Sequence, residues 1–168
     1  MLHIYTGNGQ GKTTAALGLA LRSLGRGKKV ALVQFLKKRP SGEILSLARF
    51  ENCLVRRFGK EEFLLDRPPD PEDFREAQAG MKETEKILRE RSADLLILDE
   101  INVALDLELL PPARVIKLIA DCPPGIDLVL TGRNCPKEIL SRADYAVEVR
   151  EIRHPFQHGE APREGIEF

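Results

Sequence analysis

The fold of this chain is decided near its amino terminus by the stretch Gly7-Asn8-Gly9-Gln10-Gly11-Lys12-Thr13-Thr14. The apolar run 2–5 comes directly before this stretch and predicts a short buried strand. Apolar residues at helical spacing follow over 13–24, and Gly25 ends that pattern. With Gly7 as the first glycine, Gly11, Lys12 and Thr13 match the pattern of a phosphate-binding loop, which is expected between a strand and a helix. A glycine-rich turn without a ligand is the alternative, but the strand and the helix on either side favour the loop.

The residue types in this loop suit a triphosphate. Glycines let the backbone curl so that several N–H groups point inward, and the amino end of the following helix adds further donors. Lys12 should reach the outer phosphates, and the hydroxyl of Thr13 should bind magnesium. We therefore predict that the chain binds ATP together with Mg²⁺. The residues of the loop predicted to bind ATP are Gly7, Asn8, Gly9, Gln10, Gly11, Lys12, Thr13 and Thr14.

Strand and helix patterns alternate along the rest of the chain. Further strands are predicted at 30–36, 53–58, 94–99, 127–131 and 145–149, and further helices at 43–50, from 70 onward, at 111–120 and at 136–142. The strands are continuous apolar runs, which indicates a mostly parallel sheet with helices on both faces. The predicted fold is therefore α/β. In the helix that starts at 70, the side chains expected on one face are Phe74, Ala77, Met81 and Leu88.

A single domain should span residues 1–168, because that length suits one domain. The last stretch, 152–168, contains glycine, proline and histidine and is predicted to be irregular. It also carries the apolar side chains Phe156, Ile166 and Phe168. We therefore expect this tail to pack against the domain, near the active site.

Composition and charge exclude several classes of protein. Lys plus Arg is 26 and Asp plus Glu is 26, so the formal net charge is zero, which argues against a nucleic-acid-binding protein. The three cysteines lie far apart and match no metal-binding spacing, and such a sparse count fits a reducing cytosol. The first residues do not have the pattern of a signal peptide, and no apolar run approaches about 18 residues. We therefore expect a cytoplasmic protein without a membrane span.

Two acids, Asp99 and Glu100, end the apolar strand predicted at 94–99. In a parallel sheet, ligands collect beyond the carboxyl ends of the strands, so these acids should face the same region as Lys12. A carboxylate there holds magnesium directly or through water. The predicted metal site is therefore made of Thr13, Asp99 and Glu100, and the sequence leaves open which of the two acids touches the metal.

Four basic residues outside the loop have two interpretations each. Arg133 follows the predicted strand 127–131, so it either reaches a phosphate or is a surface side chain after a tight turn. Arg22 lies in the helix after the loop, where a solvated arginine is the usual case. Lys37 and Lys38 follow a strand end, where they could form a surface for anionic ligands, but solvation is again the usual case.

Several stretches together resemble one known family. They are Thr6-Gly-Asn-Gly-Gln-Gly-Lys-Thr-Thr14, Val33-Gln-Phe-Leu-Lys37, Leu98-Asp-Glu-Ile-Asn102, Leu130-Thr-Gly-Arg133, His154-Pro-Phe156 and Gly165-Ile-Glu-Phe168. In this order they resemble the P-loop type of ATP-dependent corrinoid adenosyltransferases of cobalamin synthesis and salvage. The matches span nearly the whole chain. Each is weak beyond the phosphate loop, but together they are specific.

The resemblance implies a RecA-like P-loop fold, a homodimer and a transferase activity. The 5′-deoxyadenosyl group of ATP would pass to Co(I) of a corrinoid, and inorganic triphosphate would leave. Lys12 and Arg133 would then be the catalytic residues, because they stabilise charge that develops on the leaving triphosphate. Arg22 matches an arginine of the family that contacts the nucleotide. The alternative is a RecA-like ATPase that releases ADP and phosphate, with Glu100 as the base that activates water.

The corrinoid side of the site is where the sequence departs from the family. Many members carry a segment before the first strand that helps to cover the corrinoid, and many carry a Phe-Thr-Trp segment that displaces the lower cobalt ligand. This sequence has no Trp, and its first predicted strand begins at Leu2. The resemblance suggests Gln34 and Phe35 near the reacting groups and Phe63 as the apolar wedge. A flavin-type reductant is the expected electron-donating partner.

Overall fold

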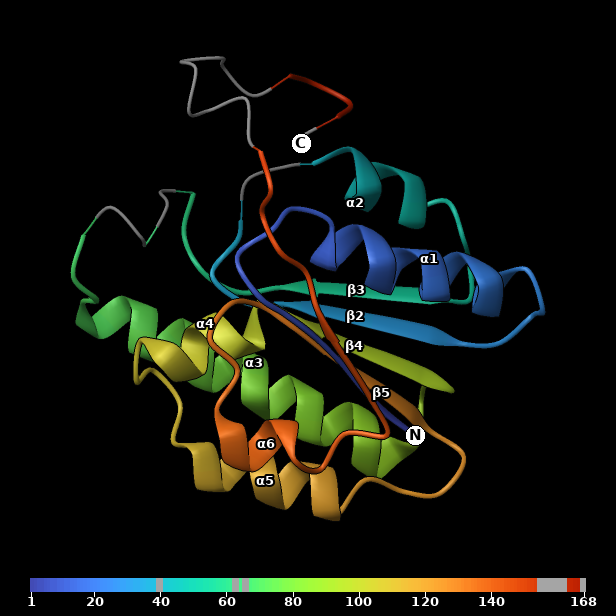
Figure 1. The fold of residues 1–168 in the computed structure, drawn as a ribbon. Coiled ribbons are helices and arrows are strands. Elements are labelled where there is room, and N and C mark those ends of the chain that lie inside the picture. Colours follow the sequence, from blue (N-terminus) through green and yellow to red (C-terminus); the bar gives the residue numbers. More distant parts are fainter. Residues whose placement is uncertain (39–40, 62–63, 65–66, 154–162, 167–168) are drawn as a thin grey trace.

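One parallel sheet organises the structure. The computed structural model describes residues 1–38, 41–61, 64, 67–153 and 163–166. Within these ranges, six strands form the sheet in the order β3-β2-β4-β5-β1-β6, and every neighbouring pair is parallel (Figure 1). The strands are β1 (Leu2–Thr6), β2 (Val30–Gln34), β3 (Cys53–Arg57), β4 (Leu95–Asp99), β5 (Asp127–Thr131) and β6 (Tyr145–Glu148). The predicted α/β fold with a parallel sheet is confirmed.

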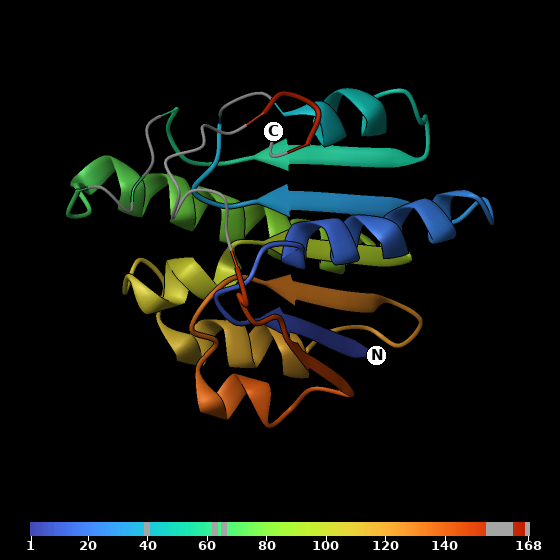
Figure 2. The same cartoon turned by 45° about the horizontal axis from the view of Figure 1, so that its top comes forward.

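Helices cover both faces of the sheet (Figures 1 and 2). They are α1 (Lys12–Leu24), α2 (Gly42–Leu47), α3 (Pro71–Glu90), α4 (Ile101–Asp106), α5 (Pro112–Ala120) and α6 (Lys137–Leu140). α1 and α2 lie on one face, and the other four lie on the opposite face. Successive strand residues pack into different layers, since Ile97 belongs to the core with Ala16 of α1, whereas Leu98 belongs to the core with Met81 of α3. Burial on both faces explains why the strands are continuous apolar runs.

The start of α3 follows its sequence signal closely. Asp70 caps the helix by accepting hydrogen bonds from the backbone N–H groups of Glu72 and Asp73, and Pro71 occupies the first helical position. Arg67 binds the carboxylate of Asp73 with two hydrogen bonds of 2.7 and 2.9 Å, and Lys60 contacts Asp70 at 2.6 Å. These contacts fix the end of the β3–α3 loop to the helix.

Besides shifts of one to three residues at the ends of other elements, three details differ from the prediction. β2 ends at Gln34, because Leu36 has a left-handed backbone with φ of 61° and turns the chain away from the sheet. The short helix α4 was missed, since it has only six residues and its preceding residue, Glu100, also has a positive φ. Phe74 is 42% exposed and does not belong to the buried face of α3, whereas Met81 does.

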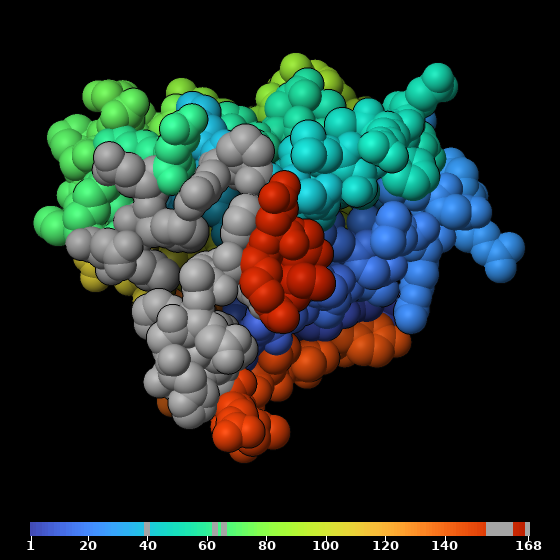
Figure 3. All heavy atoms as spheres, turned by 90° about the horizontal axis from the view of Figure 1, so that it is seen from above, coloured from blue at the N-terminus to red at the C-terminus, as the bar shows by residue number. Residues whose placement is uncertain are grey.

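The segment after β6 is only partly described. Residues 152–153 and 163–166 contain no helix or strand, as predicted for the described part of the tail. Figure 3 shows residues 163–166, in red, on the face of the molecule that carries α1 and α2. Of the three apolar side chains of the tail, Ile166 is 66% exposed, and Phe156 and Phe168 lie outside the described residues. Ile166 therefore does not pack against the domain, and packing of the rest of the tail near the active site stays a prediction. Separately, none of the helices in the described ranges has both the length and the apolarity needed to cross a membrane.

Candidate active site

The glycine-rich loop connects β1 to α1 at the carboxyl edge of the sheet. Gly7 and Gly11 have φ of 97° and 107°, backbone conformations that glycine adopts without strain. Gly11 precedes the first helical residue, and no side chain caps α1. By helix geometry, the first N–H groups of α1 have no partner within the helix, so they are available to an anion. The loop therefore offers backbone donors that suit a phosphate group.

The spacing of the loop needs one correction. The general pattern places four residues between its first glycine and the Gly-Lys pair, and that count reaches Thr6 rather than Gly7. The Thr6 hydroxyl accepts a hydrogen bond from the backbone N–H of Cys135 at 3.2 Å. Threonine in this position therefore links the start of the loop to the segment that follows β5.

Lys12 is held inside the loop. Its side chain is buried, and Nζ donates to the carbonyl oxygen of Gly9 at 2.6 Å. Burial lowers the pKa of Lys12, the negative charge of Glu100 opposes that effect, and the positive charges of Arg133 and Lys37 add to it. The ammonium of Lys12 thus lies within electrostatic reach of the acids and of Arg133, where the sequence predicted it.

Asp99 is the centre of a hydrogen-bond network at the end of β4. Its side chain is fully buried. The hydroxyls of Thr13 and Thr131 donate to Oδ1 at 2.8 and 2.7 Å. The amide of Gln34 donates to Oδ2 at 3.1 Å, and Lys37 Nζ lies 3.5 Å from the same oxygen. A carboxylate has about four lone-pair positions, so these four groups use the capacity of Asp99.

Lys37 also contacts Glu100. Its Nζ lies 3.2 Å from Glu100 Oε1, so one ammonium joins both acids. Burial lowers the pKa of Lys37, but the charges of Asp99 and Glu100 outweigh burial and raise the pKa above its ordinary value. The expectation of a solvated Lys37 was wrong, because the turn at Leu36 directs the following residue across the end of the sheet. Lys38 instead pairs with Glu76 at 3.5 Å.

Of the three residues suggested to contact the corrinoid, two are buried and one lies outside the described residues. Gln34 is 1% exposed, and its Oε1 is buried without a hydrogen-bond partner within the described part of the chain. Phe35 is fully buried, and its ring packs so closely on Gly80 of α3 that a Cβ there would meet it at 2.6 Å. Phe63 lies outside the described residues. Contact of these residues with a corrinoid stays a prediction.

The two predicted arginines lie at opposite ends of the region. Arg133 is exposed, in the loop after β5. Gly132, with φ of 127°, lets this loop approach the start of α4, and Asn102 Nδ2 donates to the carbonyl oxygen of Gly132 at 3.3 Å. Arg22 is exposed near the other end of α1, about 15 Å along the helix from Lys12. The structure therefore brings Arg133, but not Arg22, towards Lys12.

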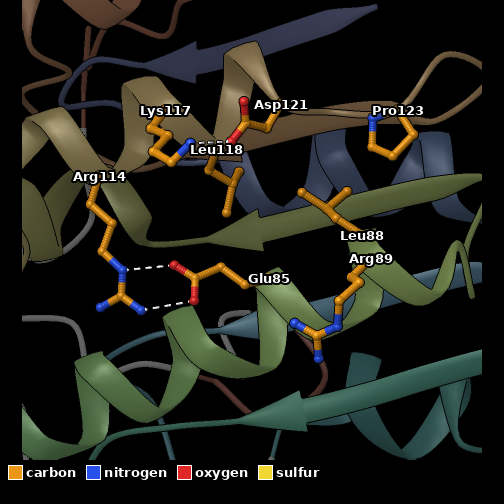
Figure 4. Close-up of a pocket in the computed structure, with 8 residues that line it drawn as sticks. All are labelled: Glu85, Leu88, Arg89, Arg114, Lys117, Leu118, Asp121 and Pro123. Atoms are coloured by element: carbon orange, nitrogen blue, oxygen red, sulfur yellow. Dashed lines mark hydrogen bonds and ion pairs between the residues drawn. The ribbon is translucent and has the colours of Figure 1, made fainter.

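A separate hollow of 270 Å³ lies between α3 and α5 (Figure 4). Its lining residues are Glu85, Leu88, Arg89, Arg114, Lys117, Leu118, Asp121 and Pro123. Arg114 binds Glu85 across it with hydrogen bonds of 2.8 and 3.0 Å. α3 begins at the carboxyl edge of the sheet and runs back, so its last residues lie towards the amino ends of the strands. This hollow is therefore not part of the candidate site.

Comparison with known proteins identifies the family. A model of ATP:corrinoid adenosyltransferase BtuR/CobO/CobP matches residues 1–168. This chain belongs to that family. The corrinoid adenosyltransferase of Escherichia coli is 33% identical to it over 98% of this chain and 84% of the relative. The corrinoid adenosyltransferase of Pseudomonas aeruginosa is 32% identical over 100% and 83%, and corrinoid adenosyltransferase CobA of Salmonella typhimurium is 32% identical over 98% and 84%. The resemblance drawn from the sequence is confirmed.

Sequence reasoning assigned no role to Thr131 and Asn102 and expected Lys37 in solvent, although all three belong to the candidate site. Thr131 is buried and holds Asp99, and its Oγ1 accepts from the backbone N–H of Glu100 at 3.0 Å. Asn102 holds the loop before Arg133, and Lys37 pairs with both acids. All three lie within the stretches that resemble the family. Their position at strand ends beside charged residues was the available signal.

Proposed function

We propose that the carboxyl edge of this sheet binds ATP as the donor of an adenosyl group. The family match over the whole chain, on a fold whose Lys12, Thr13 and Asp99 meet at one edge, carries the proposal. The chain is a transferase, and its activity is ATP-dependent adenosyl transfer to a corrinoid in cobalamin synthesis. Hydrolysis of ATP by a RecA-like ATPase is not favoured.

The triphosphate acts as a leaving group in this reaction. Co(I) of the corrinoid attacks C5′ of the ribose, a cobalt–carbon bond forms, and the C5′–O bond breaks with its electron pair going to triphosphate. The protein therefore has to stabilise negative charge on the phosphate side. Positive charge on that side comes from Lys12, Arg133 and the amino end of α1. The phosphate chain is lined by Gly7 to Gly11, which include Asn8, and by Thr14.

The donor set at the end of β4 fits a magnesium ion. Mg²⁺ prefers oxygen ligands, and Thr13, Asp99 and Glu100 supply a hydroxyl and two carboxylates. The Thr13 hydroxyl donates its hydrogen to Asp99, which leaves its oxygen lone pairs free for a metal. The hydroxyls of Thr13 and Thr131 occupy Oδ1 of Asp99, so we assign direct ligation to Thr13 and Glu100, with Asp99 orienting Thr13. The bound ion would neutralise charge on the triphosphate.

The corrinoid partner and the assembly complete the proposal. Gln34 reaches the same edge as the phosphate loop and would face the reacting groups, and Phe35 would support it from the core. Phe63 would contact the lower face of the corrinoid. A homodimer, a flavin-type reductant that delivers electrons to cobalt, and a cytoplasmic location also belong to the proposal.

The decisive experiment identifies the products. Purified protein is mixed with ATP, Mg²⁺ and chemically reduced cobalamin in the dark, and the mixture is analysed by absorption spectroscopy and ion-exchange chromatography. We expect a light-sensitive alkyl-cobalamin and inorganic triphosphate in equal amounts. Formation of ADP and phosphate without alkyl-cobalamin would show an ATPase instead. Lys12→Ala is the control that should abolish the reaction.

A further inference from the structure

Lys37 has an unusual position for a lysine that follows a strand. Its backbone is fixed, since Lys37 N–H donates to the carbonyl oxygen of Phe58 at 3.2 Å. A Cβ on Gly59 would meet the backbone nitrogen of Lys37 at 2.8 Å, so the two loops touch. The side chain then crosses the end of β2 to reach Asp99 and Glu100. The fold therefore fixes the position of the Lys37 ammonium.

Lys37 is the ion-pair partner of both acids. Among the ion pairs of described residues, no other cation contacts Asp99 or Glu100. Lys12 is directed to the Gly9 carbonyl instead. Asp99 is fully buried and Glu100 is 22% exposed, so a cation beside them matters more than at an open surface. One lysine thus compensates two carboxylates.

A second observation shows that this arrangement is incomplete without a ligand. Gln34 directs its Nε2 to Asp99, and its buried Oε1 has no hydrogen-bond partner in the described part of the chain. The orientation of the amide is fixed, because the opposite orientation would place an oxygen against a carboxylate. A buried acceptor without a donor costs free energy. Gln34 therefore presents one unpaired acceptor beside Asp99 in the described part of the chain.

We propose that Lys37 is an internal counter-ion that keeps divalent metal off Asp99 and Glu100 until the nucleotide arrives. The ammonium and a divalent cation repel each other and compete for the same carboxylate oxygens. A triphosphate supplies new negative charge, and the flexible lysine side chain can turn to phosphate oxygens. Metal and ATP then enter the site as one complex. This inference rests on the proposed function, because it assumes that the loop binds ATP.

The test measures metal binding without nucleotide. Mn²⁺ replaces Mg²⁺, and free Mn²⁺ is followed by electron paramagnetic resonance in titrations of nucleotide-free protein. We expect Lys37→Met to bind Mn²⁺ at least about tenfold more tightly than the wild type, since a competing charge is gone. Lys37→Arg keeps a cation, so its Mn²⁺ affinity should stay near that of the wild type. Lys38→Met is the matched control, because Lys38 pairs with Glu76 instead. Adding Glu100→Gln to Lys37→Met should remove the gain.

Stability gives a second readout if Lys37→Met folds poorly. A metal that binds only the folded state raises the melting temperature. Mn²⁺ should therefore raise the melting temperature of Lys37→Met more than that of the wild type. Equal Mn²⁺ affinity and equal Mn²⁺ stabilisation of the two proteins would overturn the inference.

The outcome is separate from that of the transferase assay. Suppose that the wild type forms alkyl-cobalamin and that Lys37→Met binds Mn²⁺ with the same affinity as the wild type. The role of Lys37 is then overturned, and the proposed function stands. Tighter Mn²⁺ binding by Lys37→Met, together with a wild type that forms no alkyl-cobalamin, would support the role of Lys37 as counter-ion and contradict the proposed function.

Discussion

The backbone N–H of Gly9 donates to the carbonyl oxygen of Val149 over 2.8 Å, which joins the phosphate loop to the chain that leaves β6. A Cβ on Gly9 would meet the carbonyl carbon of Arg150 at 2.7 Å. The loop proposed to bind the nucleotide is therefore shaped by the far end of the sequence as well as by its own glycines.

Gly9→Ala should weaken ATP binding by about tenfold or more and lower the free energy of unfolding by about 1 to 3 kcal/mol. The physical reason is that backbone atoms of Arg150 cannot move aside as a flexible side chain does. Isothermal titration with ATP and urea unfolding measure the two effects. Gly18→Ala in α1 is the control: a Cβ there meets nothing within 4 Å, so stability should rise by up to about 1 kcal/mol. Equal ATP affinity and equal free energy of unfolding in the two variants would contradict the close contact between Gly9 and the backbone of Arg150.

Lys12→Ala should reduce ATP affinity by more than about tenfold, because it removes a charged hydrogen-bond donor from the phosphate site. Isothermal titration measures the loss, and circular dichroism verifies the fold. Lys28→Ala changes an exposed lysine after α1 and should bind ATP as the wild type does. Unchanged ATP affinity in Lys12→Ala would show that the loop is not the triphosphate site.

Asp99→Asn should lower the free energy of unfolding by about 1 to 3 kcal/mol, since an amide cannot accept from all the donors around it. The hydroxyls of Thr13 and Thr131 and the amide of Gln34 all donate to this carboxylate. Urea unfolding measures the change, and the adenosyl transfer assay should show lost activity. Asp121→Asn, at an exposed ion pair, should shift stability by less than about 0.5 kcal/mol. An Asp99→Asn protein as stable as the wild type would argue against the network.

Arg67→Gln should destabilise the protein at neutral pH and matter less in acid. Hydrogen bonds from Arg67 hold the pKa of Asp73 below its ordinary value of 3.8, and Lys60 holds that of Asp70 at about 2. The folded-state pKa values are the lower ones, so these contacts stabilise the fold above 3.8 and lose that effect as pH falls through the folded values. Urea unfolding across pH should show that the difference in free energy of unfolding between Arg67→Gln and the wild type shrinks as the pH falls below 3.8.

The control for this pH dependence is Arg75→Gln, an exposed position on α3. Its stability difference from the wild type should be small and should not change between neutral and acidic pH. A constant difference for Arg67→Gln across the same range would mean that its effect comes from packing rather than from the Asp73 carboxylate.

Periodicity and loop chemistry predicted most of the fold. β4 was predicted because its residues are apolar on both faces, and α3 because Asp70 and Pro71 are strong signals for a helix start. α4 was missed because a six-residue helix after a left-handed Glu100 has too few positions to show a period. Lys37 was expected in solvent because its pairing depends on the turn at Leu36, which no local pattern announces. Among the site residues, contacts to ATP, metal and corrinoid stay predictions.

The place of β1 in the sheet has a consequence for how the protein is made. β1 pairs with β5 and β6, both near the end of the chain, and not with β2. The glycine-rich loop is translated before β5, β6 and Val149, the segments that hold it in place. Contacts between distant segments also form slowly during folding. On the proposed function, the nascent chain acquires its nucleotide site only when translation has passed Val149.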